Sequence, residues 1–183
     1  VLSSIKSFLI FVLAIVMAAP AIAMAKDLPI SAFKGDWRGN AISESNVSVS
    51  FPITSRDIDV DIKPTAEGDF SITWRTLLRQ KGTPEDPKEV LKETTLTFIK
   101  TDEKNVWKDS KAGDVYAGDT ISWAQLKNQT LTVYVMAISG SGGYDMQIYK
   151  RTLTGVNMEL DFTAIRDGAI RRTAKGRLIL NNY

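Results

Sequence analysis

The chain has 183 residues, 44% of them hydrophobic and 24% charged, and it contains no histidine and no cysteine. These absences exclude a Ser-His-Asp triad, a thiolate nucleophile, disulfide bonds and any metal centre that needs imidazole or thiolate ligands. Lys and Arg number 23 against 21 Asp and Glu, and this near balance gives no basic footprint for nucleic acid. We therefore expect neither a nucleic-acid partner nor a metal, and no motif indicates a cofactor.

Residues 1–25 predict a secretory signal peptide. Lys6 precedes the uncharged apolar run Phe8–Ala19, and small residues follow Pro20 in the pattern that a signal peptidase recognises. The apolar run is shorter than the roughly 20 residues that a membrane-spanning helix needs. We expect cleavage after Ala25, or alternatively after Ala23. The mature chain, 26–183, would be a single periplasmic or secreted domain with no membrane span.

From residue 33 onward the hydrophobic pattern is typical of β-strands. Apolar residues alternate with polar ones, as at Ile58, Val60 and Ile62, and turn residues recur at short intervals. The pattern predicts an all-β fold, an antiparallel up-and-down meander of about eight to ten strands that closes on itself. Residues 83–93 hold two prolines and many charges, and they predict a long polar loop. A short strand is expected around 105–108.

The turns between the last three strands decide which side chains face inward. A slip of one residue exchanges the two faces of a strand, so the turn length decides which residues of neighbouring strands share a face. The pairing of apolar residues with apolar residues favours the three-residue loops Thr154–Val156 and Arg166–Gly168. Both loops give one inner surface, which comprises Met146, Ile148, Lys150, Met158, Leu160, Phe162, Ala164, Ile170, Arg172, Ala174 and Leu178.

The segment Gly35-Asp36-Trp37 resembles the Gly-x-Trp opening of the lipocalin and calycin barrels. Avidin-like barrels open in a similar way, and Gly35, Trp37 and Asn40 match their pattern. The resemblance implies a lipocalin-like barrel in which Gly35 and Trp37 form a structural plug at one end. It also implies that an Arg of the last strand, Arg172 or Arg177, packs over Trp37.

Lys150 and Arg172 are the two cations that the predicted register places inside the barrel. A buried charge is costly unless it has a partner. One hypothesis is that they bind the anionic head of an apolar molecule, whose tail would contact Met146, Ile148, Met158, Leu160 and Phe162. In the alternative, Arg172 stacks on Trp37 and the amine of Lys150 reaches water.

These features favour an exported, non-enzymatic carrier or scavenger of a small apolar or amphipathic molecule. The alternative is a barrel with a filled core that acts as a protein-binding or inhibitory module through its surface or loops. A hydrolase that uses a pair of carboxylates is the third candidate. Asp57, Asp59 and Asp61 repeat at strand spacing, which predicts a solvated outer face rather than a calcium site.

The strand 130–138 is apolar on both faces, so its outer side needs a cover. The N-terminal segment, the 84–93 loop or a second subunit could supply it. In the last case Tyr134, Met136 and Ile138 would form a homodimer interface.

Overall fold

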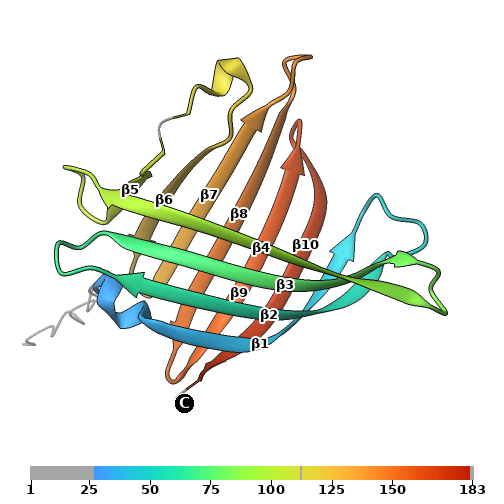
Figure 1. The fold of residues 1–183 in the computed structure, drawn as a ribbon, viewed down its shortest axis with the longest axis horizontal. Helices are drawn as coiled ribbons and strands as arrows, with labels where there is room; N and C mark the ends of the chain where they lie inside the picture. The colour runs from blue at the N-terminus through green and yellow to red at the C-terminus, as the bar shows by residue number, and fades with distance from the viewer. Residues whose placement is uncertain (1–26, 112, 182–183) are drawn as a thin grey trace, which may run out of the picture.

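A computed structural model describes residues 27–111 and 113–181 of the chain, and the predicted signal peptide lies outside them. Ten strands form a closed antiparallel barrel in which each strand pairs with its neighbours in the chain and β1 pairs with β10 (Figure 1). The predicted all-β meander is therefore confirmed. The elements are η1 (Ile30–Phe33), β1 (Gly35–Ser45), β2 (Ile53–Pro64), β3 (Phe70–Gly82), β4 (Pro87–Lys100), β5 (Val106–Asp109), η2 (Val115–Ala117), β6 (Ile121–Lys127), β7 (Thr130–Ile138), β8 (Tyr144–Thr154), β9 (Asn157–Arg166) and β10 (Ala169–Leu180).

Alternation along each strand separates the barrel interior from its outer surface. In β2, the side chains of Ile58, Val60 and Ile62 are buried, and the aspartates between them point away from the interior. Asp57 accepts a hydrogen bond from Arg79 at 2.7 Å, and Asp61 lies 2.5 Å from the Lys63 amine. The predicted solvated outer face of this strand is confirmed.

Residues 83–93 do not form the predicted loop. Only residues 83–86 form the turn, and β4 begins at Pro87 as the longest strand of the barrel. Its charged residues pair across the sheet with those of β3: Arg75 donates to Glu93 at 2.5 Å and Arg79 to Glu89 at 2.8 Å. Cross-strand pairing thus overrides the low strand propensity of this segment. The short strand expected around 105–108 is confirmed as β5.

The predicted loop between β9 and β10 is also wrong. The chain turns at Asp167 and Gly168 alone, both of which have positive φ, so Ile165 pairs with Ile170. A β-bulge then absorbs Arg171, and Arg172 pairs with Ala164. Because the bulge adds one residue to β10, Arg172, Ala174 and Leu178 still face the interior, whereas Ile170 is exposed.

The β8–β9 turn differs from the prediction by one residue, and here no bulge compensates. Thr154 pairs with Asn157 across a two-residue turn, so Phe162 pairs with Tyr149 and Leu160 with Arg151. This slip exchanges the two faces of β8. Lys150 and Ile148 therefore belong to the outer face, opposite Asp161 and Thr163.

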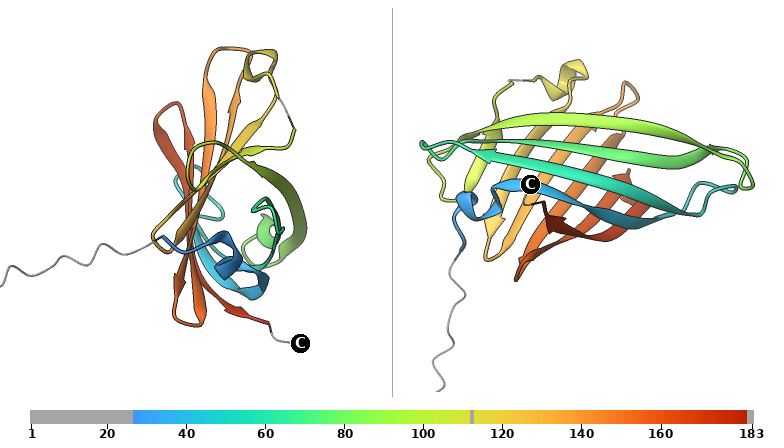
Figure 2. Two further views of the ribbon diagram at one scale, coloured as in Figure 1. Left: turned by 90° about the vertical axis from the view of Figure 1, so that its left-hand side faces the viewer. Right: turned by 60° about the horizontal axis from the view of Figure 1, so that its bottom comes forward.

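The two ends of the barrel differ. We call the end with the β1–β2, β3–β4, β7–β8 and β9–β10 hairpins the mouth, and the opposite end the base. At the base, η1 lies within the ring of strands (Figure 2), and the side chain of Phe33 is completely buried. The ring of Phe70 packs against those of Phe98 and Trp107, with centroids 5.0 and 5.4 Å away. The base is therefore a solid aromatic core.

Trp37 belongs to this base core. Its side chain is buried, and its indole N–H donates to the Phe33 carbonyl at 3.0 Å. Trp37 pairs with Leu180, whereas Arg172 pairs with Ser45 at the other end of β1. Arg177 lies 3.8 Å from Glu159 on the exposed face. The expectation that one of these arginines packs over Trp37 is therefore wrong.

The wall of the barrel is incomplete toward the mouth. β4 pairs with β5 only over Phe98–Lys100, and Ser110 adds one hydrogen bond to the Thr97 carbonyl. In the described part of the chain, no strand pairs with Pro87–Leu96 on this side. β4 instead crosses in front of β7 to β10 (Figure 1). Within the same described residues, no helix is long and apolar enough to cross a membrane.

Candidate functional site

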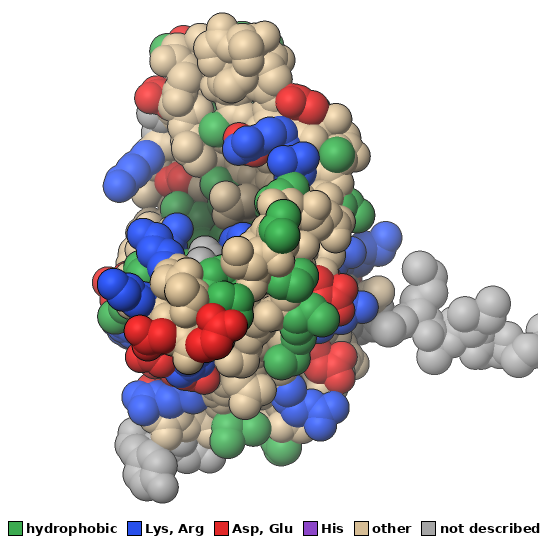
Figure 3. Space-filling view, turned by 90° about the vertical axis from the view of Figure 1, so that its right-hand side faces the viewer, with side chains coloured by type: hydrophobic (Ala, Val, Ile, Leu, Met, Phe, Trp, Pro, Cys, Tyr) green, Lys and Arg blue, Asp and Glu red, His purple; other side chains and the backbone are tan. Residues whose placement is uncertain are grey.

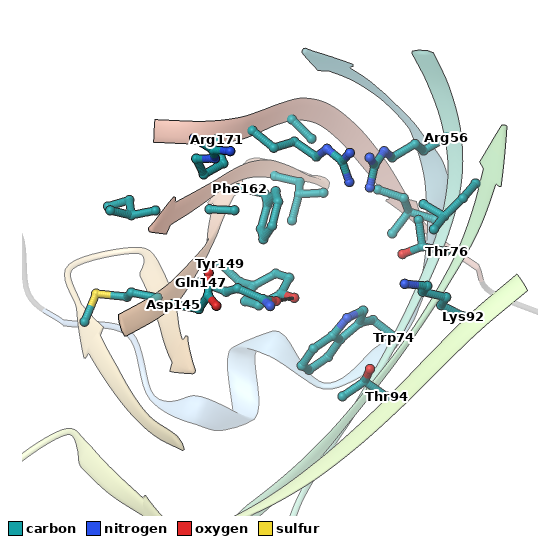
Figure 4. Close-up of a pocket in the computed structure, with 18 of the residues that line it drawn as sticks. Arg56, Trp74, Thr76, Lys92, Thr94, Asp145, Gln147, Tyr149, Phe162 and Arg171 are labelled. Atoms are coloured by element: carbon teal, nitrogen blue, oxygen red, sulfur yellow. Dashed lines mark hydrogen bonds between the residues drawn. The ribbon is translucent and has the colours of Figure 1, made fainter. Parts of the chain in front are cut away.

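The mouth half of the barrel contains a cavity of about 690 Å³, which lies within the range of small-molecule sites. Inward-facing residues of β2, β3, β4, β8, β9 and β10 form most of its wall (Figure 4). Its apolar lining includes Ile58, Leu78, Leu160, Phe162, Ala164 and Ala174.

Aromatic rings meet across the interior at the floor of this cavity. β3 and β8 lie on opposite sides of the closed barrel, yet Trp74 of β3 contacts Tyr149 of β8 with 4.8 Å between ring centroids. Phe162 of β9 extends the row, again at 4.8 Å from Tyr149. The Tyr149 hydroxyl donates to Gln147 at 2.6 Å, and burial raises the pKa of this hydroxyl. The rings thus divide the filled base from the open mouth.

Arg151 lies beside this floor with 1% of its surface exposed. Its guanidinium carbon is 5.2 Å from the centroid of Trp74 and 5.5 Å from that of Tyr149. Among the described residues, its buried Nε and Nη1 have no hydrogen-bond partner. Burial lowers the pKa of Arg151 to about 10, so the side chain is still a cation at neutral pH. The two rings stabilise this cation, but no described carboxylate neutralises it.

A second pair of guanidinium groups lies nearer the mouth. Arg56 of β2 is 8% exposed, and Arg172 of β10 is half-buried. Burial and the positive charge of Arg172 lower the pKa of Arg56 to about 10. Burial also lowers the pKa of Arg172, whose buried Nε has no hydrogen-bond partner within the described residues. β2 and β10 flank β1, so both arginines reach the interior from the same side of the barrel.

Charge is distributed unevenly around the cavity. The residues that line it include six basic side chains and a single carboxylate, Asp145. Arg166 binds this carboxylate through two hydrogen bonds of 2.7 and 3.1 Å. The space-filling view toward the mouth shows a hollow with Lys and Arg side chains beside and above it, and with Asp and Glu side chains also nearby (Figure 3). The basic lining residues are Arg56, Lys92, Arg151, Arg166, Arg171 and Arg172.

The structure brings together part of the predicted site. Leu160, Phe162 and Arg172 line the cavity from the predicted faces of β9 and β10, and Met146 contributes from the rim. Met158 is completely buried and pairs with Leu153 and Leu178 in the base half of the barrel. Lys150 and Ile148 face outward because of the slip in β8.

The sequence-based prediction missed Arg56, Trp74, Tyr149 and Arg151. The alternation of β2 could have indicated Arg56, which lies on the same strand face as Ile58 and Val60. In β3, Trp74 likewise shares a face with Phe70 and Ile72. The inward orientation of Tyr149 and Arg151 could be predicted only with a two-residue β8–β9 turn. The apolar pattern argued against that turn, because the true inner face of β8 is the more polar one.

No family model matches the chain, and no curated protein matches it. Among solved structures, it is similar to a protein of unknown function from the DUF3598 family of Nostoc punctiforme, with a TM-score of 0.57 and 12% identity. That match covers 90% of this chain and 53% of the other, so the chain spans about half the length of that protein. Such a likeness shows a shared fold alone.

Two further structures resemble the barrel more distantly. Rv2717c from M. tuberculosis matches with a TM-score of 0.48 and 9% identity, over 86% of this chain and all of the other. An S-type phycobiliprotein lyase from Guillardia theta matches with a TM-score of 0.39 and 10% identity, over 85% and 94% of the two chains.

Proposed function

We propose that the chain is an exported, non-enzymatic binding protein, a carrier or scavenger whose barrel holds one small amphipathic molecule. The cavity of about 690 Å³ in the mouth half carries this proposal. A module with a filled core is not expected to contain a hollow of this size, because protein interiors are normally close-packed. Aromatic and aliphatic walls with a few polar groups are the usual lining of a ligand site.

The composition of the lining supports binding over carboxylate-based hydrolysis. A glycosidase-type mechanism needs two carboxylates on either side of the bond to be cleaved. The cavity offers one carboxylate, Asp145, and Arg166 already binds it. Its other charged lining residues are cations, which suit recognition of a ligand better than proton transfer at neutral pH.

Native mass spectrometry of protein purified without denaturation tests the proposal. We expect a stoichiometric small-molecule adduct on the native protein. Ala164 lines the cavity, so Ala164→Trp should place an indole ring in the space of the ligand and abolish the adduct. Thr163→Trp places the same ring on the outer face of β9 and should retain it. An adduct that survives Ala164→Trp, or a neutral dye such as N-phenyl-naphthylamine that binds both variants equally, would contradict a cavity ligand.

Export is part of the proposal. Its support is the signal-like segment 1–25, which lies outside the described residues. Expression of the full chain, followed by N-terminal sequencing of the protein recovered outside the cytoplasm, tests it. We expect the recovered chain to begin at Lys26, or at Met24 for the alternative cleavage site. Recovery of uncleaved protein from the cytoplasm alone would contradict export.

A homodimer through Tyr134, Met136 and Ile138 is a further proposal about the same protein. The three side chains lie half-buried on the outer face of β7, where Tyr134 stacks on Trp123 with 4.8 Å between centroids. Met136 pairs with Ile121 and with Met146, which extends an apolar row across neighbouring strands. Native mass spectrometry should then give a doubled mass that Met136→Glu reduces to the monomer. A monomeric wild type would contradict this interface.

A further inference from the structure

The cavity concentrates positive charge in a protein whose total charge is close to zero. Six basic side chains line it, and its single carboxylate is held by Arg166. A bound amphiphile would therefore enter a cavity whose lining holds more cations than carboxylates. An anionic ligand lowers the electrostatic cost of this arrangement, whereas a neutral one does not.

These cations lie at two depths. Arg151 pairs with Leu160 of β9, and Arg172 pairs with Ala164 of the same strand, four residues nearer the mouth. At about 3.4 Å per residue, the backbone positions of the two arginines are offset by roughly 14 Å along the direction of β9. The deeper centre is Arg151 against the rings of Trp74 and Tyr149. The outer centre is Arg172 together with Arg56, whose charges lie close enough to repel each other.

Both centres have donors for an anion. Arg151 is 99% buried, lines the cavity, and has two guanidinium nitrogens without a partner in the described chain. The buried Nε of Arg172 is likewise available. Guanidinium groups bind carboxylate and phosphate oxygens through paired, charge-assisted hydrogen bonds. A monoanion bound by Arg151 would leave the buried Nε of Arg172 without an acceptor, and one bound by Arg172 would leave the guanidinium nitrogens of Arg151 without one.

Building on the proposed function, we infer that the ligand of this cavity carries two anionic groups separated by an apolar body. Arg151 holds the inner group at the aromatic floor, and Arg172 with Arg56 holds the outer group. The apolar body lies between them along Leu160, Phe162 and Ala174. The ligand class is thus a long dicarboxylate or a related two-headed amphiphile.

Matched pairs of linear acids test this inference. Titration calorimetry of the purified protein compares each monocarboxylate, from octanoate to hexadecanoate, with the dicarboxylate of the same length. At the best length we expect the dicarboxylate to bind about 10- to 100-fold more tightly, the effect of one charge-assisted contact. Arg151→Met should reduce this ratio to about 2, the statistical advantage of two equivalent ends, and Arg172→Met should weaken the dicarboxylate similarly.

Arg177→Met is the matched control, because it makes the same replacement on the exposed face of β10 and should leave the ratio unchanged. Thermal unfolding of each variant shows whether it folds, and Arg172→Met keeps the test decisive if Arg151→Met does not. Equal affinity for monocarboxylates and dicarboxylates at every length would overturn the inference. N-phenyl-naphthylamine that binds the wild type but not Ala164→Trp would still support the cavity. Failure of this dye and of every acid to bind would overturn both proposals.

Discussion

At Arg151 the proposed binding role conflicts with stability. A guanidinium that is 1% exposed has lost its hydration, and the faces of Trp74 and Tyr149 return only part of that free energy. Its methylene stem packs well in the core, but its charge does not. A residue that served only to stabilise the barrel would be apolar at this position. The unliganded protein therefore keeps a stability cost that an anion would relieve.

Arg151→Met should for this reason raise the stability of the unliganded protein. Removal of a buried cation that lacks a carboxylate partner, in favour of an apolar side chain of similar volume, is expected to increase the free energy of unfolding by about 1–4 kcal/mol. Urea denaturation followed by tryptophan fluorescence measures the change. Lys150→Met, at the neighbouring exposed position, should change it by less than about 0.5 kcal/mol. A loss of stability in Arg151→Met would show that the guanidinium has structural partners in the fold.

At the scale of the strands, the β9–β10 hairpin shows how one extra residue preserves a face. The tight Asp167-Gly168 turn alone would direct Arg171 and Thr173 inward. Because the bulge takes up Arg171, Arg172 and Ala174 face the cavity instead. The carbonyl of Arg171 accepts a hydrogen bond from the Asn46 amide at 3.0 Å, so the bulge also anchors the β1–β2 loop.

Deletion of Arg171 should accordingly be tolerated. The residues on either side of the bulge already have the pairing of a regular hairpin, so the shortened strand keeps Ile170 outside and Arg172 inside. We expect the deletion variant to fold with native-like circular dichroism, at the cost of one exposed hydrogen bond, about 1 kcal/mol. Lys175 lies in the regular part of β10. Its deletion should instead turn the inward-facing residues on one side of it outward, and the outward-facing ones inward, so the variant should not unfold cooperatively. Equal effects of the two deletions would contradict the assigned bulge.

Alternation was sufficient to predict most of the strands and the closed meander, though not the first half of β4, because alternation follows directly from burial of one sheet face. Turn lengths were not predictable in the same way. In β8 the outer face holds Met146 and Ile148, and the inner face holds Gln147 and Arg151, so matching by hydrophobicity selected the wrong register. The failure falls at the candidate site, where the polar groups that are proposed to bind the ligand replace core residues. In β4 the ion pairs with β3 that stabilise the strand become visible only once the two strands are paired.

At the scale of the whole molecule, the barrel separates two tasks along its axis. The base, closed by η1 and the buried rings of Trp37, Phe70 and Trp107, supplies the packed core on which stability depends. The mouth half contains a cavity in place of a packed core, and basic side chains line this cavity. The net charge of +2 conceals this separation.

The pH dependence of anion binding should reflect the arginines of the cavity. The protonated guanidinium is the form that binds an anion, and burial lowers the pKa of both Arg151 and Arg56 to about 10, well below the usual range of arginine. Affinity for an alkyl sulfonate, whose own charge is constant, should be flat from about pH 6 to 9 and fall as the pH rises through 10. Calorimetric titration measures this profile. Constant affinity up to pH 12, in protein that circular dichroism shows to be folded, would contradict the role of these two groups.

The unpaired edge of β4 gives the barrel a seam. Everywhere else in the described wall, neighbouring strands are joined by ladders of hydrogen bonds, so any widening there would break several bonds at once. Between Pro87–Leu96 and the far wall the described residues form no such ladder, so this part of the β3–β4 hairpin is joined to the rest of the wall only through the pairing of β3 with β2. For the proposed ligand, this seam is the part of the wall whose widening would break the fewest backbone hydrogen bonds, and the base would remain closed.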